Sequence, residues 1–417
     1  MSGRFVVVGL RRSGLAACEA IRRVWPRAEV LGTDSATDLD LTRLDALGVE
    51  YVTGVADVPI TDATALVKSP GVTGGAPLVR HARKAGLPVW SEVELAYRLL
   101  GEPLIVGVTG TNGKTTTTEL IGAMLREDRG CRVEVAGNVG RALTELAGRV
   151  APDTWIVCEL SSFQLEDIES FRPRIAVLLN LTPDHLDRHA TLDDYRAAKL
   201  RVFENQLPED VAVLPRGFGE VPGAARRIEF APDDELPAEP LIPGEHNREN
   251  AAAAAVAARA AGLPDEAIAE GLRTFAGVPH RLELVREVGG VRFVNDSKAT
   301  NPEAAERALW AYPPGIRLIL GGSQKRSSYT GLARAAHERS VAKAYLIGES
   351  ADDIAEALAA AGIRFADSGT LEQAVADAFA DAEAGEVVLL SPACASYDQF
   401  RDFEDRGERF RELVEAL

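Results

Sequence analysis

The chain contains little cysteine, histidine or methionine, and it lacks any long hydrophobic run. Its four cysteines, Cys18, Cys131, Cys158 and Cys394, are far apart and form no CxxC pair or Cys/His cluster, which excludes a cysteine-rich zinc site. We expect a reducing cytosol, with Cys158 and Cys394 as small core residues because they lie in apolar runs. No stretch reaches the roughly 18 apolar residues of a membrane-spanning helix. The strand-like run 5–8 does not resemble a secretory signal, so we expect none.

Basic residues are also scarce, because 46 Lys and Arg stand against 63 Asp and Glu, a formal charge of −17. This balance argues against nucleic-acid or anionic-membrane partners, which need a basic face. An anionic substrate would have to be held locally, by helix N-termini and single Lys or Arg side chains. We therefore expect a monomeric cytoplasmic protein whose partners are small molecules.

Alternating strand and helix patterns divide the 417 residues into three α/β blocks. We predict a Rossmann-like domain at about 1–92, a central domain with a P-loop ATPase-like parallel or mixed sheet at 93–277, and a second Rossmann-like domain at 278–417. Residues 208–243, rich in Pro, Gly and charge, are expected to form an irregular insert. The predicted strands are 5–9, 29–33, 104–108, 155–158, 175–179, 291–294, 317–320, 344–347 and 387–390. The predicted helices include 93–100 and the Ala-rich 250–261.

A phosphate-binding loop is the strongest local signal. The strand 104–108 is followed by a Gly-rich turn, Lys-Thr and a helix, so backbone amides and a helix N-terminus would converge on phosphate oxygens. Lys114 would reach the β- and γ-phosphates, and the Thr115 hydroxyl would ligate Mg²⁺. The strict GxxxxGK[ST] pattern is not met, since Val108 occupies its first glycine position. The residues expected to bind ATP are Gly110, Thr111, Asn112, Gly113, Lys114, Thr115 and Thr116.

Two further polar residues follow neighbouring predicted strands. Glu159 ends the strand 155–158, and His185 lies in the loop after 175–179. Because parallel strands present their carboxyl ends at one edge, we expect both side chains near the phosphate loop, as metal ligands. Taken alone, a strand-end carboxylate is as often solvated, and a loop histidine is more often a surface or packing residue.

Seven segments, in this order along nearly the whole chain, resemble the Mur ligase family. They are GTNGKTTT (110–117), CELSSFQL (158–165), NLTPDHLDRH (180–189), GEHNREN (244–250), PHRLE (279–283), NDSKATNP (295–302) and SPACASYDQF (391–400). The first three are shared with all Mur ligases and with folylpolyglutamate synthases. The last two resemble the family member that adds D-glutamate to UDP-N-acetylmuramoyl-L-alanine for peptidoglycan.

The resemblance implies an ATP-dependent ligase. ATP would phosphorylate the substrate carboxylate, and the amine of D-glutamate would attack the acyl phosphate through a tetrahedral intermediate. Two Mg²⁺ ions are implied, one held by Thr115 and Glu159, the other by His185 and a carbamoylated Lys199. Taken alone, Lys199 on a charged helix would be a solvated side chain. The implied catalytic residues are Lys114, Glu159, His185, Lys199 and Lys298.

The resemblance also implies substrate contacts in each block. Those for ATP beyond the phosphate loop are Asn250, Arg281 and Asp296. Those for the UDP substrate are Arg12, Ser13, Asp34, Ser35, Ser69, Gly71, Asn138 and His185. Those for D-glutamate are Thr300, Lys325, Ser396 and Phe403, which offer donors and a cation to a dicarboxylate.

The chain departs from the family pattern at two places. Ser328 and Tyr329 stand where the family has Asp and Phe, close to Lys325. Arg11 and Arg12 stand where relatives often have a Gly-x-Gly turn. We hypothesise that these two arginines attract the diphosphate of the UDP substrate.

Three alternatives remain open. Gly9, Gly14 and Asp34 vaguely imitate the fingerprint of a nicotinamide-dependent dehydrogenase, although Arg11 occupies the middle glycine position. A P-loop module that hydrolyses ATP only to change shape would leave the two C-terminal segments unexplained. A sibling ligase would add another amino acid, or extend folate with glutamate, by the same mechanism.

Overall fold

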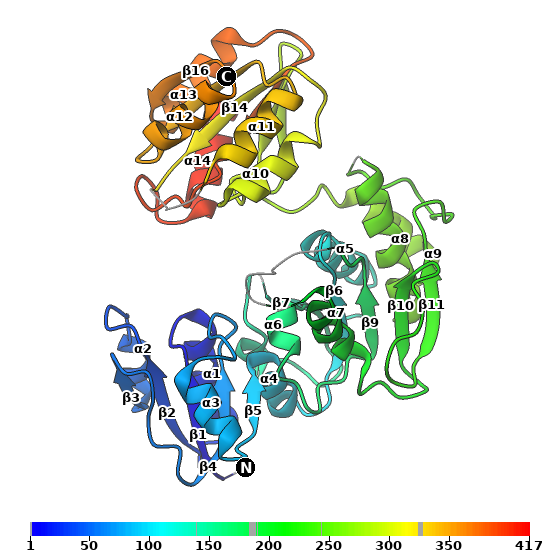
Figure 1. The fold of residues 1–417 in the computed structure, drawn as a ribbon. Helices are drawn as coiled ribbons and strands as arrows, with labels where there is room; N and C mark the ends of the chain where they lie inside the picture. The colour runs from blue at the N-terminus through cyan, green and yellow to red at the C-terminus, as the bar shows by residue number, and fades with distance from the viewer. Residues whose placement is uncertain (1, 139, 183–188, 190, 243, 324–327) are drawn as a thin grey trace. The chain divides into compact units, whose positions relative to one another are not determined.

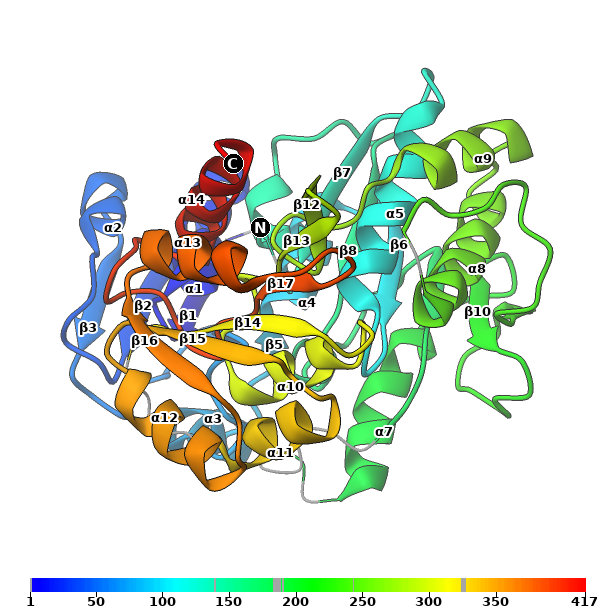
Figure 2. The same cartoon turned by 90° about the horizontal axis from the view of Figure 1, so that it is seen from above.

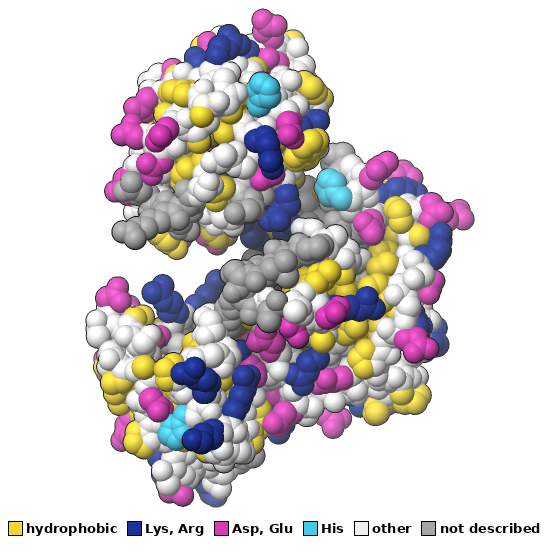
Figure 3. Space-filling model, in the orientation of Figure 1, with side chains coloured by type: hydrophobic (Ala, Val, Ile, Leu, Met, Phe, Trp, Pro, Cys, Tyr) yellow, Lys and Arg dark blue, Asp and Glu magenta, His cyan; other side chains and the backbone are white. Residues whose placement is uncertain are grey.

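The structure, a computed structural model, describes residues 2–138, 140–182, 189, 191–242, 244–323 and 328–417. The chain separates into two compact units, residues 1–275 and 276–417, and each is described by itself. The first unit contains two β-sheets and the second contains one (Figure 1). Acidic and basic side chains are interspersed over the visible face of each unit (Figure 3). None of the helices in the described ranges is long and apolar enough to cross a membrane.

The N-terminal sheet is fully parallel, in the order β3-β2-β1-β4-β5. Its central strand β1 is a continuous apolar run because both faces of the sheet are covered by helices. Helices α1 and α4 cover one face, and α3 covers the other. The strands are β1 Arg4–Val8, β2 Glu29–Asp34, β3 Glu50–Thr53, β4 Ala63–Lys68 and β5 Val89–Ser91. The helices are α1 Arg12–Val24, α2 Thr42–Leu47, α3 Pro77–Lys84 and α4 Glu92–Leu100.

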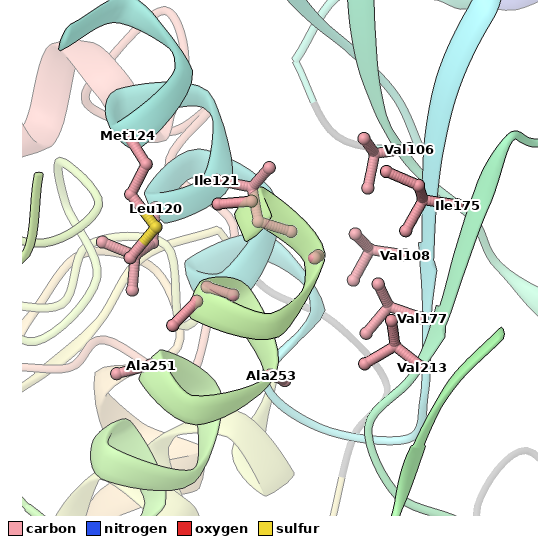
Figure 4. Packing of buried hydrophobic residues seen from close by; sticks show 14 of the residues in the cluster. Val106, Val108, Leu120, Ile121, Met124, Ile175, Val177, Val213, Ala251 and Ala253 are labelled. Atoms are coloured by element: carbon pink, nitrogen blue, oxygen red, sulfur yellow. The ribbon is translucent and has the colours of Figure 1, made fainter. Parts of the chain in front are cut away.

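The second sheet is also parallel, in the order β11-β10-β9-β6-β8-β7. Alanines of α8 and the larger Leu120, Ile121 and Met124 of α5 fill the space over β6, β9 and β10 (Figure 4). The strands are β6 Leu104–Thr109, β7 Val133–Gly137, β8 Trp155–Glu159, β9 Ile175–Leu178, β10 Val211–Pro215 and β11 Arg226–Phe230. The helices are α5 Lys114–Glu127, α6 Ser162–Leu165, α7 Leu192–Leu200, α8 Glu245–Ala260 and α9 Asp265–Thr274, with the 3-10 turns η1 Leu143–Leu146 and η2 Arg201–Phe203.

The third sheet has the order β12-β13-β17-β14-β15-β16, and only β12 is antiparallel. Helices α10, α11 and α12 cover one face, and α13 and α14 cover the other (Figure 2). The strands are β12 Glu283–Val288, β13 Val291–Asn295, β14 Ile316–Gly321, β15 Lys343–Ile347, β16 Phe365–Gly369 and β17 Val387–Leu390. The helices are α10 Pro302–Leu309, α11 Thr330–Glu338, α12 Ala351–Ala360, α13 Leu371–Asp381 and α14 Phe403–Glu415.

The predicted α/β class and the predicted core strands are confirmed, but two details were wrong. The expected irregular insert 208–243 contains β10 and β11, which extend the second sheet. The short apolar run of β10 is buried, and β11 tolerates its charges because it is an edge strand. Strands that alternate with helices predict a parallel third sheet, but this sheet is mixed, because a two-glycine turn at 289–290 joins β12 to β13 as a hairpin. All four cysteines are free, and Cys158 and Cys394 are buried as expected.

Helix α4 joins the two sheets of the first unit, since it packs on the cores of both. Its Glu94 is fully buried and accepts hydrogen bonds from the amides of 169, 170 and 171, at 3.0, 3.0 and 2.8 Å. The Ser170 hydroxyl and Arg98 Nε donate to the same carboxylate, both at 2.6 Å. Burial alone would raise the pKa of Glu94, but these donors outweigh it and hold the pKa below its usual range.

A pH-dependent stability follows from Glu94. Because its pKa is lower in the folded state, its contribution is complete above the unfolded value of about 4.3 and is lost as the pH falls through the folded value. Glu94→Gln should lower the free energy of unfolding at pH 7 by about 1–3 kcal/mol. The difference in the free energy of unfolding between the variant and the wild type should be smaller at pH 4 than at pH 7. Urea unfolding followed by tryptophan fluorescence measures it.

Glu127→Gln, on the exposed end of α5, is the matched control and should change stability at neither pH. A gap of equal size for Glu94→Gln at pH 4 and pH 7 would contradict the assignment.

Candidate active site

The predicted phosphate loop connects β6 to α5 in a conformation that needs its glycines. Gly113 caps α5 with φ +81°, and Gly110 has φ +152°. A Cβ on Gly113 would lie 2.1 Å from Oδ1 of Asn250, a buried residue of α8. Since any side chain at 113 would collide with Asn250, the loop and α8 approach each other as closely as backbone allows.

Two lysine ammonium groups converge on this loop. Lys114 folds back so that its Nζ donates to the carbonyls of Gly110 at 2.9 Å and Thr111 at 2.8 Å. Lys199, from α7, also donates to the Gly110 carbonyl, at 2.8 Å. The Lys199 side chain is 2% exposed and lies 4.7 Å from the centre of the Tyr195 ring. The interpretation of Lys199 as a solvated side chain was therefore wrong, because α7 turns this residue inward.

Glu159 is placed as predicted, at the end of β8, beside the phosphate-loop strand β6. Its side chain is 3% exposed, and Oε1 accepts a hydrogen bond from Asn138 Nδ2 at 3.0 Å. In the described structure Oε2 is buried without any hydrogen-bond partner. A buried carboxylate oxygen is costly without a donor or a cation. Thr115, 7% exposed at the start of α5, offers a second oxygen ligand, so this pair fits a Mg²⁺ ion.

One predicted metal ligand, His185, lies outside the described residues, because it falls in 183–188. Within the described ranges no group of three or more His, Cys, Asp or Glu residues is arranged to hold a metal. The loop after β9 is nevertheless tied to the phosphate loop. Asn180 Oδ1 accepts from the Asn112 amide at 2.8 Å, and Thr111 Oγ1 lies 3.1 Å from the Tyr195 hydroxyl.

Sequence analysis missed Asn180 and Tyr195 as parts of the site. Asn180 directly follows a predicted strand on the ligand-binding edge, which is a usable signal. Tyr195 precedes Lys199 by four residues and therefore shares its helix face. Both contacts were detectable in principle from positions relative to residues already chosen.

The carboxyl edge of the N-terminal sheet gathers most of the predicted UDP-substrate residues. Arg12 and Ser13 open α1, Asp34 ends β2, and Ser69 follows β4. Asp34 accepts from the amides of 10 and 36, at 2.7 and 2.9 Å, and the Ser69 hydroxyl donates to the Gly9 carbonyl at 2.7 Å. These two side chains thus build the loops, whereas Arg12, like the neighbouring Ser35 and Gly71, is exposed.

In the second unit, Asp296 and Lys298 follow β13. Asp296 is 5% exposed, and it accepts from the Ser391 hydroxyl at 2.7 Å and from the Leu282 amide at 3.2 Å. Burial raises the pKa of Asp296 to about 7, although Ser391 and the nearby Arg281 act in the opposite direction. The carboxyl is therefore poised to change charge near neutrality.

Two of the predicted D-glutamate residues, Thr300 and Ser396, fall on loops that a fully buried arginine holds together. Arg406, in α14, donates to Ser297 Oγ and to the Ser297 carbonyl, each at 2.9 Å, and to the Cys394 carbonyl at 3.1 Å. It also reaches the carbonyls of Gly321 and Ala395, both at 3.4 Å. Burial lowers the pKa of Arg406 to about 10, although the charge of Asp398 acts in the opposite direction. No sequence signal distinguished this arginine from the others on an amphipathic helix.

These loops carry Thr300 and Ser396, and Phe403 begins α14 itself. Phe403 packs its ring edge-on to His280, 6.3 Å between centroids. Ser396 is 2% exposed. Lys325 lies outside the described residues.

The departure at 328–329 is accommodated locally. Tyr329 is 4% exposed, and its hydroxyl lies 3.1 Å from Cys394 Sγ, which also contacts the Ser350 hydroxyl at 3.1 Å. Burial raises the pKa of Tyr329. Ser328 accepts from the amide of Thr330 at 3.5 Å, at the start of α11. The polar atom that tyrosine adds to a phenylalanine position thus has a buried partner.

Comparison with known proteins places the chain among ligases. Residues 108–218 match the Mur ligase middle domain, and residues 280–394 match the Mur ligase glutamate ligase domain. A UDP-N-acetylmuramoylalanine–D-glutamate ligase of Pelotomaculum thermopropionicum is 43% identical over 455 residues, covering 99% of this chain and 98% of the relative. The enzyme of the same name from Anaeromyxobacter dehalogenans is 44% identical, covering 99% and 97%.

Solved structures agree in fold. MurF from Acinetobacter baumannii has a TM-score of 0.60 at 17% identity, covering 98% of this chain and 93% of its own. The UDP-N-acetylmuramate–alanine ligase MurC of Thermotoga maritima has a TM-score of 0.58 at 18% identity, covering 99% of both chains. At these identities the likeness shows a shared fold. Both solved structures have a three-domain architecture.

The tight approach of Gly113 to Asn250 gives a test of the phosphate loop. Gly113→Ala adds a methyl group at a positive φ and against Asn250, so it should weaken MgATP binding on the order of tenfold or more. Isothermal titration with MgATP measures the dissociation constant.

Gly86→Ala is the matched control, because Gly86 also has a positive φ, +70°, but no atom within 4 Å of the added Cβ. It should leave the dissociation constant unchanged. Unaltered MgATP binding by Gly113→Ala would remove the assignment of this loop.

Proposed function

The chain belongs to the Mur ligase family, and from that premise we propose that it joins D-glutamate to UDP-N-acetylmuramoyl-L-alanine, using ATP, in peptidoglycan biosynthesis. The observation that carries the proposal is the identity of above 40% to D-glutamate ligases over 99% of the chain. The phosphate loop, with Lys114 folded over it, supplies the matching chemistry.

The reaction needs positioning and charge neutralisation more than an enzyme nucleophile. A carboxylate is a poor electrophile at neutral pH, so the γ-phosphoryl group is transferred to it, which creates an acyl phosphate with a good leaving group. Lys114 and the amides at the start of α5 stabilise the negative charge on the transferring group. The amine of D-glutamate then attacks the acyl carbon, and phosphate leaves with ADP already formed.

Mg²⁺ fits the described residues at one position. Thr115 and Glu159 would hold it, and bound Mg²⁺ would neutralise phosphoryl oxygens. This choice is supported by Oε2 of Glu159, which has no hydrogen-bond partner within the described ranges. A second Mg²⁺ would take His185 and Lys199, and we propose that Lys199 then carries a carbamate.

The surroundings of Lys199 support a carbamate. Lys114 and Lys199 both donate to the Gly110 carbonyl, so two like charges lie close together in a largely buried place. A carbamate replaces one of these cations with an anionic oxygen ligand. Lys114 would then be the neighbouring cation that compensates it.

We assign the three proposed domains as follows. Residues 1–92 would bind the UDP substrate through Arg12, Ser13, Asp34, Ser35, Ser69 and Gly71, with Asn138 and His185 added from the next domain. Residues 93–277 would bind ATP on 110–116 and beside Asn250. Residues 278–417 would complete the ATP site through Arg281, Asp296 and Lys298, and would bind D-glutamate through Thr300, Lys325, Ser396 and Phe403. We propose that the enzyme acts as a monomer in the cytoplasm.

The other functional classes fit less well. In a nicotinamide-dependent dehydrogenase the middle glycine of the fingerprint lets the backbone approach the pyrophosphate, but Arg11 occupies that position here. A shape-changing ATPase would not explain the similarity to D-glutamate ligases, which extends over 99% of the chain and so includes both terminal blocks. A sibling ligase would add a different amino acid, and the following experiment identifies which amino acid this enzyme uses.

Amino-acid-dependent phosphate release tests the proposed function. With ATP, Mg²⁺ and UDP-N-acetylmuramoyl-L-alanine, D-glutamate should stimulate release, whereas L-alanine, L-glutamate and diaminopimelate should not. Lys114→Ala should abolish turnover, a loss of at least about a hundredfold, because charge stabilisation of the transferring group is removed. Its circular dichroism spectrum should match that of the wild type.

Stimulation by another amino acid would point to a sibling ligase. Substantial activity of Lys114→Ala would instead remove the phosphate-loop mechanism.

The exposed Arg12 gives a test of the UDP-substrate site. Arg12→Ala removes a cation from the start of α1, so the KM for the UDP substrate should rise about tenfold while the KM for ATP stays unchanged. Arg22→Ala, in the last turn of the same helix, is the control and should alter neither constant. Equal effects of Arg12→Ala on both constants would reject a direct role at the diphosphate.

A further inference from the structure

A desolvated ion pair lies in the first unit, away from the residues to which a role has been assigned. Lys68, the last residue of β4, has no exposed side-chain surface, and its Nζ lies 2.6 Å from Asp167 Oδ2. The carboxylate of Glu166 lies 3.5 Å from the same ammonium group. The Asp167 side chain is 5% exposed, so water screens the pair very little. A buried cation of this kind is tolerated only where its partners are fixed.

The two carboxylates belong to a segment that docks against the N-terminal sheet. This segment, 166–169, follows α6 of the second sheet. The Asp167 carbonyl accepts from the Ser91 amide at 2.7 Å, and its carboxylate pairs with Arg83 at 2.7 Å. The indole of Trp90 donates to Glu169 at 3.0 Å. The position of Lys68 is therefore set by the second sheet, although the residue belongs to the first.

Lys68 in turn fixes the loops proposed for the UDP substrate. The next residue, Ser69, donates its hydroxyl to the Gly9 carbonyl at 2.7 Å. A Cβ on Gly14 would lie 1.9 Å from that same carbonyl, so the first turn of α1 packs directly on it. A displacement of Lys68 thus moves Ser69, the loop after β1 and the start of the helix that carries Arg12.

Glu166 extends the network towards the phosphate loop. Its Oε1 lies 3.5 Å from Nδ1 of His189, whose Nε2 is 2.9 Å from the Ser162 hydroxyl. The His189 ring is 5% exposed and packs edge-on to Tyr195, 5.3 Å between centroids. The Tyr195 hydroxyl lies 3.1 Å from Thr111 Oγ1 of the phosphate loop. Side-chain contacts therefore run without a break from Lys68 to the nucleotide loop.

We propose that Lys68 is a positioning residue for the ligase reaction, which sets the UDP-substrate loops at a fixed place relative to the phosphate loop through its buried pairing with Asp167 and Glu166. The inference rests on the proposed function, since it assumes that the edge of the N-terminal sheet holds the UDP substrate. Lys68 itself touches neither substrate nor the reacting atoms. It acts by setting where the carboxylate of the UDP substrate lies relative to the γ-phosphate of ATP. The rate of phosphoryl transfer depends strongly on this alignment.

The test uses the full-length chain with Lys68→Met, which keeps the length of the side chain and removes its charge. The dissociation constant of UDP-N-acetylmuramoyl-L-alanine, measured by calorimetry, should rise about tenfold, while that of MgATP should change less than about twofold. The same split should appear between the two KM values in the phosphate-release assay. Asp167→Asn, which leaves Glu166 to pair with Lys68, should show a smaller effect in the same direction and decides the matter if Lys68→Met does not fold.

Two controls separate positioning from stability. Arg132→Met breaks an ion pair to Asp153 of similar length, 2.7 Å, whose side chains are 65% and 67% exposed, and it should change neither constant. The double variant Lys68→Met/Asp167→Leu also removes the buried Asp167 carboxylate that has lost Lys68, so it should recover the thermal midpoint. Binding of the UDP substrate should nevertheless remain weak, because an apolar contact is not directional and does not replace the ion pair in fixing the position of β4.

The outcomes are distinct. Unchanged binding of the UDP substrate in Lys68→Met, an equal loss of MgATP binding, or full recovery of binding in the double variant would each overturn the inference. A wild type that binds both ligands but does not use D-glutamate would overturn the proposed function, and binding alone would then decide the role of Lys68. A wild type that does not bind the UDP substrate would overturn both.

Discussion

The carbonyl of Gly110 is the point on which the nucleotide site depends. Two buried or part-buried ammonium groups, those of Lys114 and Lys199, donate to this one oxygen. The loop has no side chains at 110 and 113, where φ is positive, and Asn250 of α8 lies against Gly113. Two lysine side chains therefore hold the loop, and among the described residues the buried Oε2 of Glu159 has no hydrogen-bond partner.

Much of this site was accessible from the sequence because its signals are local. A strand, two glycines, Lys-Thr and a helix predict the phosphate loop, and a carboxylate after the next strand predicts Glu159. Lys199 was not predictable from local pattern, since it is the tertiary packing of α7 that turns a residue on a charged helix inward. Burial of Lys68 is a still stronger case, because its partner Asp167 lies far along the chain, in the segment after α6 that docks against the N-terminal sheet.

The limits of sequence are similar in the fold. Strands buried on both faces, such as β1 and β6, form apolar runs and were predicted. Edge strands carry charge because one side meets solvent, so β11 and β12 have no such signal and were missed. The resemblance to a family found the segment with Ser396, but it could not reveal that a fully buried Arg406 holds the two residues just before it, Cys394 and Ala395.

The alanine-rich helix α8 has a consequence for how this enzyme can vary. Seven of its alanines are among its buried residues, and the same helix presents Asn250 to Gly113. A larger side chain at one of these alanines would push α8 away from the elements packed against it. A close-packed interface has no free volume for the added atoms, so whole elements must move. The alanines of this helix thus set the distance between α8 and the phosphate loop. We expect them to tolerate fewer substitutions than most other parts of the chain.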